Sequence, residues 1–234
     1  MKNRSLKISI IIPTLNEAVY IARLLMYLQE HSSVKNIKEI IVVDGGSSDD
    51  TTEIASDFGA MVLHSPKGRS KQMNYGARRA KGQILYFLHA DTFPPKKFDT
   101  NILNAVAHRQ TAGCFRMKFD SNSNFLKFFA SLSAINHKIC RGGDQSLFVT
   151  KSLFQKMQGF NEDYLILEDS EFIGRLYKET KFKVLPQKVI TSARKYEKCG
   201  TLRLQYHFGI IHLKNILGAG PDQLYDYYSN KITL

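Results

Sequence analysis

The sequence is poor in the features that stabilise secreted domains or anchor a chain in a membrane. Its three cysteines are an odd number at wide spacings, which indicates neither a disulfide framework nor a zinc site. No stretch approaches the roughly 18 uncharged apolar residues that a membrane-spanning helix needs. The apolar run Ile8–Ile12 is too short for a secretory signal and stops at Pro13. These absences predict a cytoplasmic protein with reduced thiols.

Acidic side chains are also scarce relative to basic ones. The chain has 33 Lys and Arg residues against 21 Asp and Glu residues, a formal net charge of +12. This excess predicts an anionic partner, such as a nucleic acid, a phosphorylated ligand or an acidic membrane surface. The charge and eleven tyrosines prompt a nucleic-acid hypothesis, but the sequence contains no recognisable nucleic-acid-binding module, so we predict no such partner.

In the first half of the chain, β-branched apolar runs alternate with helical patterns. Residues 7–12 and 39–44 are continuous apolar runs, typical of strands covered on both faces of a parallel sheet. Between them, residues 16–32 have a helical period, with Asn16 as the expected N-cap. The alternation continues with a helix at 49–59, a strand at 60–65, a helix at 70–82 and a strand at 83–90. This order predicts a doubly wound α/β sheet that binds ligands beyond the carboxyl ends of its strands.

The alternation is looser after Pro94 and Pro95. We expect a helix at 96–108, a strand at 113–119 and an aromatic-rich helix at 124–139. The second half is therefore predicted to be mixed α+β. No internal repeat, low-complexity tract or long linker marks a clean domain boundary.

Polar groups occupy three of the expected strand ends, at residues 14–17, 44–50 and 89–91. Asp44 begins a turn of small residues in which backbone N–H groups can approach a ligand while the carboxylate accepts hydrogen bonds from a base or ribose. The alternative is a capped turn between strand and helix, because three good N-cap residues follow: Ser47, Ser48 and Asp49.

His89 and Asp91 lie two residues apart, so they share a face if the pleat of the strand persists. An imidazole and a carboxylate at the mouth of the sheet suit a magnesium or manganese ion held by one or two protein groups and substrate phosphates. The alternative is structural, with Asp91 capping the next turn and His89 half-buried with its hydrogen bonds satisfied.

The first expected strand lacks the glycines of a dinucleotide-binding turn. A Gly-x-Gly-x-x-Gly pattern would have to follow it, and residues 11–18 contain no glycine. The sequence therefore argues against a dehydrogenase. A nucleotide-dependent methyltransferase is disfavoured for the same reason.

Four segments, residues 13–18, 43–52, 68–82 and 88–95, together resemble the family 2 glycosyltransferases of the GT-A fold. More narrowly, they are similar to the subgroup labelled radical-SAM/selenodomain-associated glycosyltransferases. The resemblance runs from about residue 8 to residue 196. It implies the GT-A (nucleotide-diphospho-sugar transferase) fold, with a doubly wound, mostly parallel sheet and a mixed α+β acceptor-side half. We therefore expect one domain over 1–234, made of a nucleotide-binding half at 1–95, an acceptor-side half at 96–199 and a C-terminal helical extension at 200–234.

The resemblance also implies roles for residues on the donor side. Three residues are expected to contact the nucleoside: Pro13, Glu17 and Asp44. Arg69 matches a basic residue near the base and phosphates. The family's Asp-x-Asp element binds ribose and metal; here its first acid is replaced by His89, which puts the ribose contact in doubt, while Asp91 matches the metal-binding acid. The implied donor is a UDP- or GDP-sugar, and the implied cofactor is Mg²⁺ or Mn²⁺.

Residues 141–149 and 166–172 resemble the family's acceptor-side segments. The first contains the expected acceptor-side residues Gly143, Asp144 and Gln145. In the second, Asp169 matches the acid that takes the proton of the acceptor hydroxyl in inverting members, and we expect the start of the helix to keep it ionised. Glu168 is the alternative base. Without the upstream motifs, this segment would be interpreted as the acidic first turn of a helix.

A late element at 192–200 is a weaker match that contributes Arg194 to the acceptor side. Processive polysaccharide synthases carry Gln-x-x-Arg-Trp, whereas Thr191 stands at the Gln position and Tyr196 is displaced from the Trp position. The resemblance therefore implies transfer of single sugars. Residues 202–218 combine basic, aromatic and aliphatic side chains; such a helix can rest on an anionic membrane and receive a lipid-linked acceptor, or it can pack on the core.

The sequence thus predicts a metal-dependent, inverting, non-processive glycosyltransferase with an unknown acceptor and peripheral contact with a membrane. The replacement of the usual acid by His89 leaves an alternative open. In that alternative, the protein is a catalytically idle relative that binds nucleotide or scaffolds a membrane complex.

Overall fold

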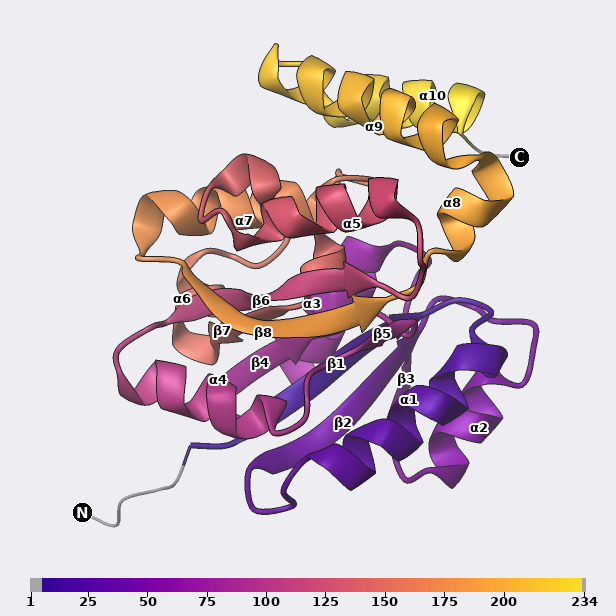
Figure 1. The fold of residues 1–234 in the computed structure, drawn as a ribbon. Helices are drawn as coiled ribbons and strands as arrows, with labels where there is room; N and C mark the ends of the chain where they lie inside the picture. The colour runs from indigo at the N-terminus through magenta and orange to yellow at the C-terminus, as the bar shows by residue number, and fades with distance from the viewer. Residues whose placement is uncertain (1–5, 233–234) are drawn as a thin grey trace.

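The computed structural model describes residues 6–232, which form helical layers on the two faces of one sheet (Figure 1). In this part of the chain the sheet has eight strands in the order β3-β2-β1-β4-β7-β6-β8-β5. The first half is parallel and consists of β1 (Ile8–Thr14), β2 (Ile37–Asp44), β3 (Met61–His64) and β4 (Ile84–Phe87). The second half mixes directions and consists of β5 (Thr92–Phe93), β6 (Ala112–Phe119), β7 (Leu147–Thr150) and β8 (Lys183–Thr191). The basic start of the chain, residues 1–5, lies outside the described residues.

Helices cover both faces of the sheet. One core lies under α1 (Ala18–His31), α2 (Thr51–Asp57) and α4 (Phe98–Ala107). The other lies under α3 (Arg69–Arg79), α6 (Lys151–Lys156) and α7 (Glu168–Glu179). Ile10 and Ile12 of β1 point into the first core, whereas Ile11 points into the second. Because both faces are buried, the strand has the continuous apolar sequence that predicted it.

The predicted α/β class is confirmed, but several element ends differ from prediction. The fourth strand ends at Phe87, three residues before its expected end. The expected helix at 124–139 stops early: α5 (Asn124–Ser131) is followed by short 3-10 turns η1 (Leu132–Ala134) and η2 (Lys138–Cys140). The hydroxyls of Ser131 and Ser133 donate to carbonyl groups three residues back, which gives the backbone an alternative to the helical ladder.

Asn16 does not cap the first helix, contrary to prediction. Its backbone is left-handed, with φ of 54°, and its side-chain oxygen accepts a 2.8 Å hydrogen bond from the Ser48 N–H. The N–H of Ala18 instead donates to Asp49, over 3.2 Å. These polar side chains therefore join the loop after β1 to the loop after β2. A local capping rule cannot detect such a link, because its partners are about 30 residues apart.

The C-terminal part consists of α8 (Arg194–Cys199), α9 (Thr201–Ile216) and α10 (Pro221–Lys231). In Figure 1, α9 and α10 lie side by side at one end of the molecule, beyond α5 and α7. Leu204 and Ile211 of α9 are buried with Leu224 of α10 against residues 164–167. The helix predicted at 202–218 therefore does pack on the rest of the protein. No helix within residues 6–232 is both long enough and apolar enough to cross a membrane.

A close contact at Gly76 lets α3 lie directly on the sheet. A Cβ atom there would lie 2.7 Å from Ile11 Cγ2 and 2.9 Å from Val43 Cγ2. We expect Gly76→Ala to lower the free energy of unfolding by about 1–3 kcal/mol, because the added methyl group overpacks this contact. Urea denaturation measures the change.

Gly174 in α7 is the matched control, because a Cβ atom at this position meets nothing within 4 Å. Gly174→Ala should raise the free energy of unfolding by about 0.5–1 kcal/mol through the better helix propensity of alanine. If both variants were stabilised, α3 would not approach β1 and β2 this closely.

Candidate active site

A cavity of about 630 Å³ lies at the carboxyl ends of β1 and β8 and beside the turn that follows β4. The starts of α3, α7 and α8 contribute to its wall, as does the short turn η3 (Gly143–Gln145), while α9 and α10 contribute side chains from the C-terminal end. This is the place where an α/β sheet is expected to bind its ligand.

On one side of the cavity, Arg194 holds two carboxylates together. Its guanidinium donates hydrogen bonds of 2.9 and 2.6 Å to the two carboxylate oxygens of Glu17, and its Nη2 lies 3.1 Å from Asp91 Oδ2. The same group stands 4.4 Å from the ring centroid of Tyr20. Burial raises the pKa of Asp91; the Arg194 charge opposes this, but the pKa stays above its ordinary value. The bidentate geometry is one that arginine provides and lysine does not.

His89 lies between two carboxylates on the next part of the wall. Its Nδ1 is 3.7 Å from Asp144 Oδ1, and its Nε2 is 3.8 Å from Asp169 Oδ2. Burial lowers the pKa of His89, but the two carboxylates outweigh burial and bring the pKa above its ordinary value. Gly143 makes this arrangement possible, since a Cβ atom there would lie 2.1 Å from Asp169 Oδ2 and 2.7 Å from His89 Cε1.

Glu168 and Asp169 form a buried acidic pair at the start of α7, with exposed fractions of 2% and 6%. Arg69 Nη1 lies 3.2 Å from Glu168 Oε1, which accepts no hydrogen bond from any described residue. Burial, together with the charge of Glu168, raises the pKa of Asp169 to about 7. The expectation that the start of the helix keeps Asp169 fully ionised near neutral pH is therefore wrong, because burial beside a second carboxylate outweighs the helix dipole.

Most of the residues predicted to bind the donor or the metal meet at this cavity. Its wall includes Pro13, Glu17, Arg69, His89 and Asp91. The pleat of a strand does not bring His89 and Asp91 together, since β4 has already ended; they come from the turn after it.

Asp44 is the predicted donor residue that does not line the cavity. Its Oδ2 accepts 2.8 Å hydrogen bonds from the N–H groups of Gly46 and Ser47, and the Ser47 hydroxyl donates to its Oδ1 over 2.5 Å. Burial raises the pKa of Asp44, but these hydrogen bonds outweigh burial and keep the pKa below its ordinary value. The carboxylate thus organises the turn after β2. The capped turn given as the alternative is not formed as predicted, because Asp50 is the residue at the N-cap of α2 and its side chain makes no capping hydrogen bond.

The predicted acceptor-side residues divide in the same way. Gly143, Asp144 and Arg194 line the cavity, but Arg194 binds Glu17 and Asp91 and so lies with the residues predicted for the donor side and not with the acceptor side. Gln145 does not: its Oε1 accepts a 2.5 Å hydrogen bond from Arg141 Nη1, and its amide donates to the Cys140 carbonyl oxygen over 2.6 Å. Arg141 is itself buried and lines the cavity, so Gln145 supports the wall from behind.

Several side chains of the wall were not predicted from the sequence. They include Lys67, Gln72, Lys195, Phe208 and Tyr228. Gln72 lies inside a motif that carried the family resemblance, and its amide donates 2.8 Å hydrogen bonds to the carbonyl oxygens of Thr14 and Val43. Lys195 Nζ lies 2.7 Å from the Tyr228 hydroxyl and faces the rings of Phe208 and Tyr228. No local pattern signals these last contacts, because they depend on how α9 and α10 fold back.

The acidic residues of the cavity suit a metal ion only in combination with a ligand. Among the described residues, no group of three or more His, Cys, Asp or Glu side chains is arranged to hold a metal ion. Asp91 presents one carboxylate to the cavity and shares it with Arg194. One carboxylate is sufficient where substrate phosphates and water complete the coordination of Mg²⁺ or Mn²⁺. The donor set therefore fits a phosphate-bridged ion rather than an all-protein site.

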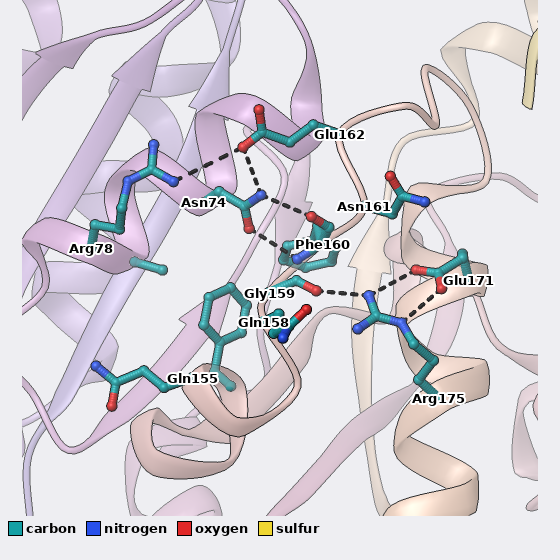
Figure 2. Close-up of a pocket in the computed structure, with 12 residues that line it drawn as sticks. Asn74, Arg78, Gln155, Gln158, Gly159, Phe160, Asn161, Glu162, Glu171 and Arg175 are labelled. Carbon is teal, nitrogen blue, oxygen red and sulfur yellow. Dashed lines mark hydrogen bonds and ion pairs between the residues drawn. The ribbon is translucent and has the colours of Figure 1, made fainter.

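A second cleft, of about 650 Å³, lies between α3, α6 and α7 (Figure 2). Asn74 makes three hydrogen bonds of 2.9 Å there, two with the backbone of Phe160 and one with Glu162. Arg175 donates to both carboxylate oxygens of Glu171 and to the Gly159 carbonyl oxygen. These polar groups are already paired with one another. They fix the loop that leads into α7 and hence the position of its acidic pair.

Known proteins with similar sequences and structures show to which family the chain belongs. Residues 9–165 match the family model described as glycosyl transferase family 2. A probable glycosyltransferase of Bacillus subtilis, YdaM, is 27% identical over 196 residues, which cover 73% of this chain and 46% of that protein. An uncharacterized glycosyltransferase of Rickettsia typhi is 30% identical over 181 residues, which cover 69% of this chain and 56% of the relative. The chain thus spans about half the length of these curated relatives.

Two solved structures illustrate the shared architecture. The mannosyltransferase PcManGT from Pyrobaculum calidifontis, in complex with GDP-Man and Mn²⁺, superposes with a TM-score of 0.68 at 21% identity over 97% of this chain and 70% of that one. Staphylococcus aureus TarS in complex with UDP-GlcNAc gives a TM-score of 0.68 at 22% identity over 80% of this chain and 58% of that one. At these identities the likeness shows the GT-A-like fold. Together with the family match over more than half of its length, it shows that the chain belongs to the family 2 glycosyltransferases.

Proposed function

We propose that the protein transfers one sugar from a nucleotide-diphosphate donor to a hydroxyl group of an acceptor in the cavity at the strand ends. The observation that carries the proposal is the combination of Arg69 and Arg194 with a buried carboxyl group, Asp169, in one cavity. The cations suit a diphosphate, and the carboxyl group suits proton transfer. The two solved structures named above contain GDP-Man and UDP-GlcNAc, which supports either a GDP-sugar or a UDP-sugar as the donor.

On the donor side, we assign the nucleoside to the end formed by Pro13 and Glu17, with Arg69 near the phosphates. Asp44 contributes through the turn that it organises, and His89 stands next to the ribose. A diphosphate that enters this cavity brings negative charge close to Glu17 and Asp91. The guanidinium of Arg194 therefore has to give up part of its contact with these carboxylates and bind the ligand.

We assign the metal ion to Asp91, whose carboxylate would hold Mg²⁺ or Mn²⁺ together with the donor diphosphate. When bound, the ion supplies positive charge that offsets the charge of the departing diphosphate. Arg69 and Arg194 supply fixed positive charge on the same side. The carboxylate of Asp91 is available for this role once Arg194 shifts toward the phosphates.

We assign the general base to Asp169 and keep Glu168 as the alternative. The base takes the proton of the acceptor hydroxyl as that oxygen bonds to the anomeric carbon and the bond from this carbon to the diphosphate breaks. Attack from the side opposite the leaving group inverts the anomeric configuration. A carboxyl group with a pKa of about 7 is well matched to this task near neutral pH.

Apolar side chains also contribute to the wall of the cavity. Leu165, Leu167, Phe208 and Ile211 form part of this wall, together with Gly143 and Asp144. We therefore propose a lipid-linked acceptor with an apolar body. The element around Arg194 departs from that of processive enzymes, which supports transfer of single sugars. We propose three further points: the protein belongs to the radical-SAM/selenodomain-associated subgroup, forms a single transferase domain over the whole chain and is located in the cytoplasm.

One observation favours the alternative of a catalytically idle, nucleotide-binding relative. Arg194 already neutralises both Glu17 and Asp91 in this structure, and His89 replaces the usual first acid of the metal-binding element. Such a protein would bind a nucleotide without metal and would not cleave the donor. Donor hydrolysis to free sugar, measured with and without Mn²⁺, separates the two functions.

Asp91→Asn should weaken metal-dependent nucleotide binding by about tenfold or more, because the charge that attracts the cation is lost while the shape is kept. Calorimetric titration of GDP and UDP, with Mn²⁺ or with a chelator, measures the effect. Asp222→Asn on α10 is the control, since Asp222 is exposed and does not line the cavity. An equal gain in affinity from Mn²⁺ in wild type and Asp91→Asn would refute the assignment of the metal ion.

The raised pKa of Asp169 also predicts a pH-dependent stability. From its ordinary value of 3.8 up to about 7, the folded protein keeps a proton that the unfolded chain releases, so this group makes stability fall as pH rises through that range. Asp169→Asn should therefore unfold at a higher temperature than wild type at about pH 8, with little difference at about pH 5, since Asp169 is neutral there. A difference of 1 kcal/mol corresponds to about 2–4 °C for a chain of this size.

Thermal melts across this pH range test the prediction without any knowledge of the acceptor. Asp163→Asn is the control, because Asp163 is exposed on the loop before α7. An Asp169→Asn variant whose stability relative to wild type did not change with pH would show that Asp169 is ionised throughout.

Removal of the base should affect turnover far more than donor binding. We expect Asp169→Asn to reduce transfer, or hydrolysis of the donor as a provisional assay, by about 10²–10⁴-fold, because positioned proton transfer typically contributes that much. Nucleotide affinity should stay nearly unchanged. If Asp169→Asn keeps full activity and Glu168→Gln loses it, Glu168 is the base; if neither loses activity, the cavity does not catalyse this transfer.

A further inference from the structure

We propose that the outer face of α9 docks on the surface of an anionic lipid bilayer. This face is turned away from Ile211, the α9 residue that is buried and lines the cavity. The surface consists of five apolar side chains, here called the α9 stripe: Leu202, Tyr206, Leu213, Ile216 and Leu217.

The α9 stripe is exposed along its whole length. Its five side chains have exposed fractions of 71%, 65%, 55%, 63% and 76%, in chain order. At about 100° per residue, they lie within an arc of roughly 100° on one side of the helix. Leu204 and Ile211, which are 1% and 0% exposed, lie on the opposite side and pack against α10 and residues 164–167. The helix therefore has an apolar face for the protein and a second apolar face that no described residue covers.

Charges next to the α9 stripe indicate what kind of surface fits it. Arg203 and Lys214 are exposed and flank the stripe along one edge, since each directly follows a stripe residue in the sequence. No Asp or Glu occurs between residues 201 and 221. The acids nearest in the sequence are Glu197 on α8, and Asp222 and Asp226, which stand on α10 with Lys231. A helix with an apolar stripe, a basic edge and an amphipathic tyrosine is typical of helices that lie in the interface of a membrane with negative headgroups.

A second copy of the chain fits the α9 stripe less well. A stable protein interface takes about 20–30 residues from each side, whereas this stripe offers five. Two copies joined through it would also bring Arg203 and Lys214 near the same residues of the partner, with no acid on α9 to balance them. An anionic lipid surface supplies the missing negative charge and needs no complementary side chains.

The position of α9 gives docking a consequence for the cavity. The hairpin of α9 and α10 stands at one end of the molecule (Figure 1), and Phe208, Ile211 and His212 of the same helix line the cavity. When α9 is docked, lipid headgroups therefore lie on one side of the helix, and the part of the cavity assigned to the acceptor lies on the other. Delivery of an acceptor from the bilayer rests on the proposed function; docking itself does not.

Vesicle co-sedimentation at low and high salt tests the proposal. We expect the wild-type protein to bind vesicles of equal parts phosphatidylcholine and phosphatidylglycerol, to bind pure phosphatidylcholine far more weakly, and to be released by salt. The double variant Leu213→Glu, Leu217→Glu should bind the anionic vesicles at least about tenfold more weakly, because two apolar side chains no longer leave water. Both side chains are more than half exposed, so the fold should persist.

Two controls separate this surface from the rest of the molecule. The pair Val19→Glu, Val34→Glu changes two exposed valines at 74% and 88% exposure in the N-terminal part of the chain and should leave binding nearly unchanged. The pair Arg203→Glu, Lys214→Glu should weaken binding to anionic vesicles by about tenfold or more, whereas Lys35→Glu, Lys38→Glu, an equal change of charge elsewhere, should have a much smaller effect.

Three results would overturn the proposal. The first is that the wild-type protein does not bind the anionic vesicles, and the second is that it binds both vesicle types equally. The third is that the Leu213→Glu, Leu217→Glu variant binds as strongly as the wild-type protein does. A dimer in light scattering that this variant converts to a monomer would assign the stripe to a second copy instead. Nucleotide binding is measured in parallel, so a failure of docking with intact nucleotide binding leaves the proposed function unaffected.

Discussion

Acidic side chains crowd one cavity of this protein, and their repulsion has to be offset by basic side chains from distant parts of the chain. The acidic groups are Glu17, Asp91, Asp144, Glu168 and Asp169. Arg194, which is 177 positions from Glu17 in the sequence, binds that residue and Asp91; Arg69 lies beside Glu168, and His89 lies between Asp144 and Asp169. Because a buried carboxylate without a partner costs several kcal/mol, removal of any of these basic side chains should disturb the cavity beyond its own contacts.

This balance explains the chemistry proposed for the cavity. Asp169 is buried beside Glu168, and burial together with the charge of this neighbour raises the pKa of Asp169 to about 7. A diphosphate would draw Arg69 and Arg194 toward itself and leave Glu17, Asp91 and Glu168 in need of new partners. A divalent ion beside Asp91 would replace part of the charge that Arg194 withdraws. The ligand and the ion are therefore expected to bind together.

The α/β order and the approximate place of the site could be predicted from the sequence, because both depend on local signals. Continuous apolar runs mark strands buried on two faces, and polar residues after these runs mark the carboxyl edge of the sheet. The place of Pro13, Glu17 and Arg69 on the cavity wall followed from these signals together with the family resemblance.

What the sequence did not predict depends on distances through space. The partners of Asn16 and Gln145, the turn that engages Asp44 and the fold-back of α9 involve contacts that no periodic pattern records. The pKa of Asp169 was mispredicted for the same reason. The helix start is visible in the sequence, whereas burial beside Glu168 is visible only in the folded chain.

Hydrogen–deuterium exchange with GDP or UDP and Mn²⁺ tests most directly whether this cavity is the donor site. We predict slower exchange in residues 13–17, 67–72 and 89–91 when nucleotide and metal are added together, with no change in residues 155–162 around the second cleft. Protection confined to residues 155–162, or no protection by either nucleotide, would contradict this prediction.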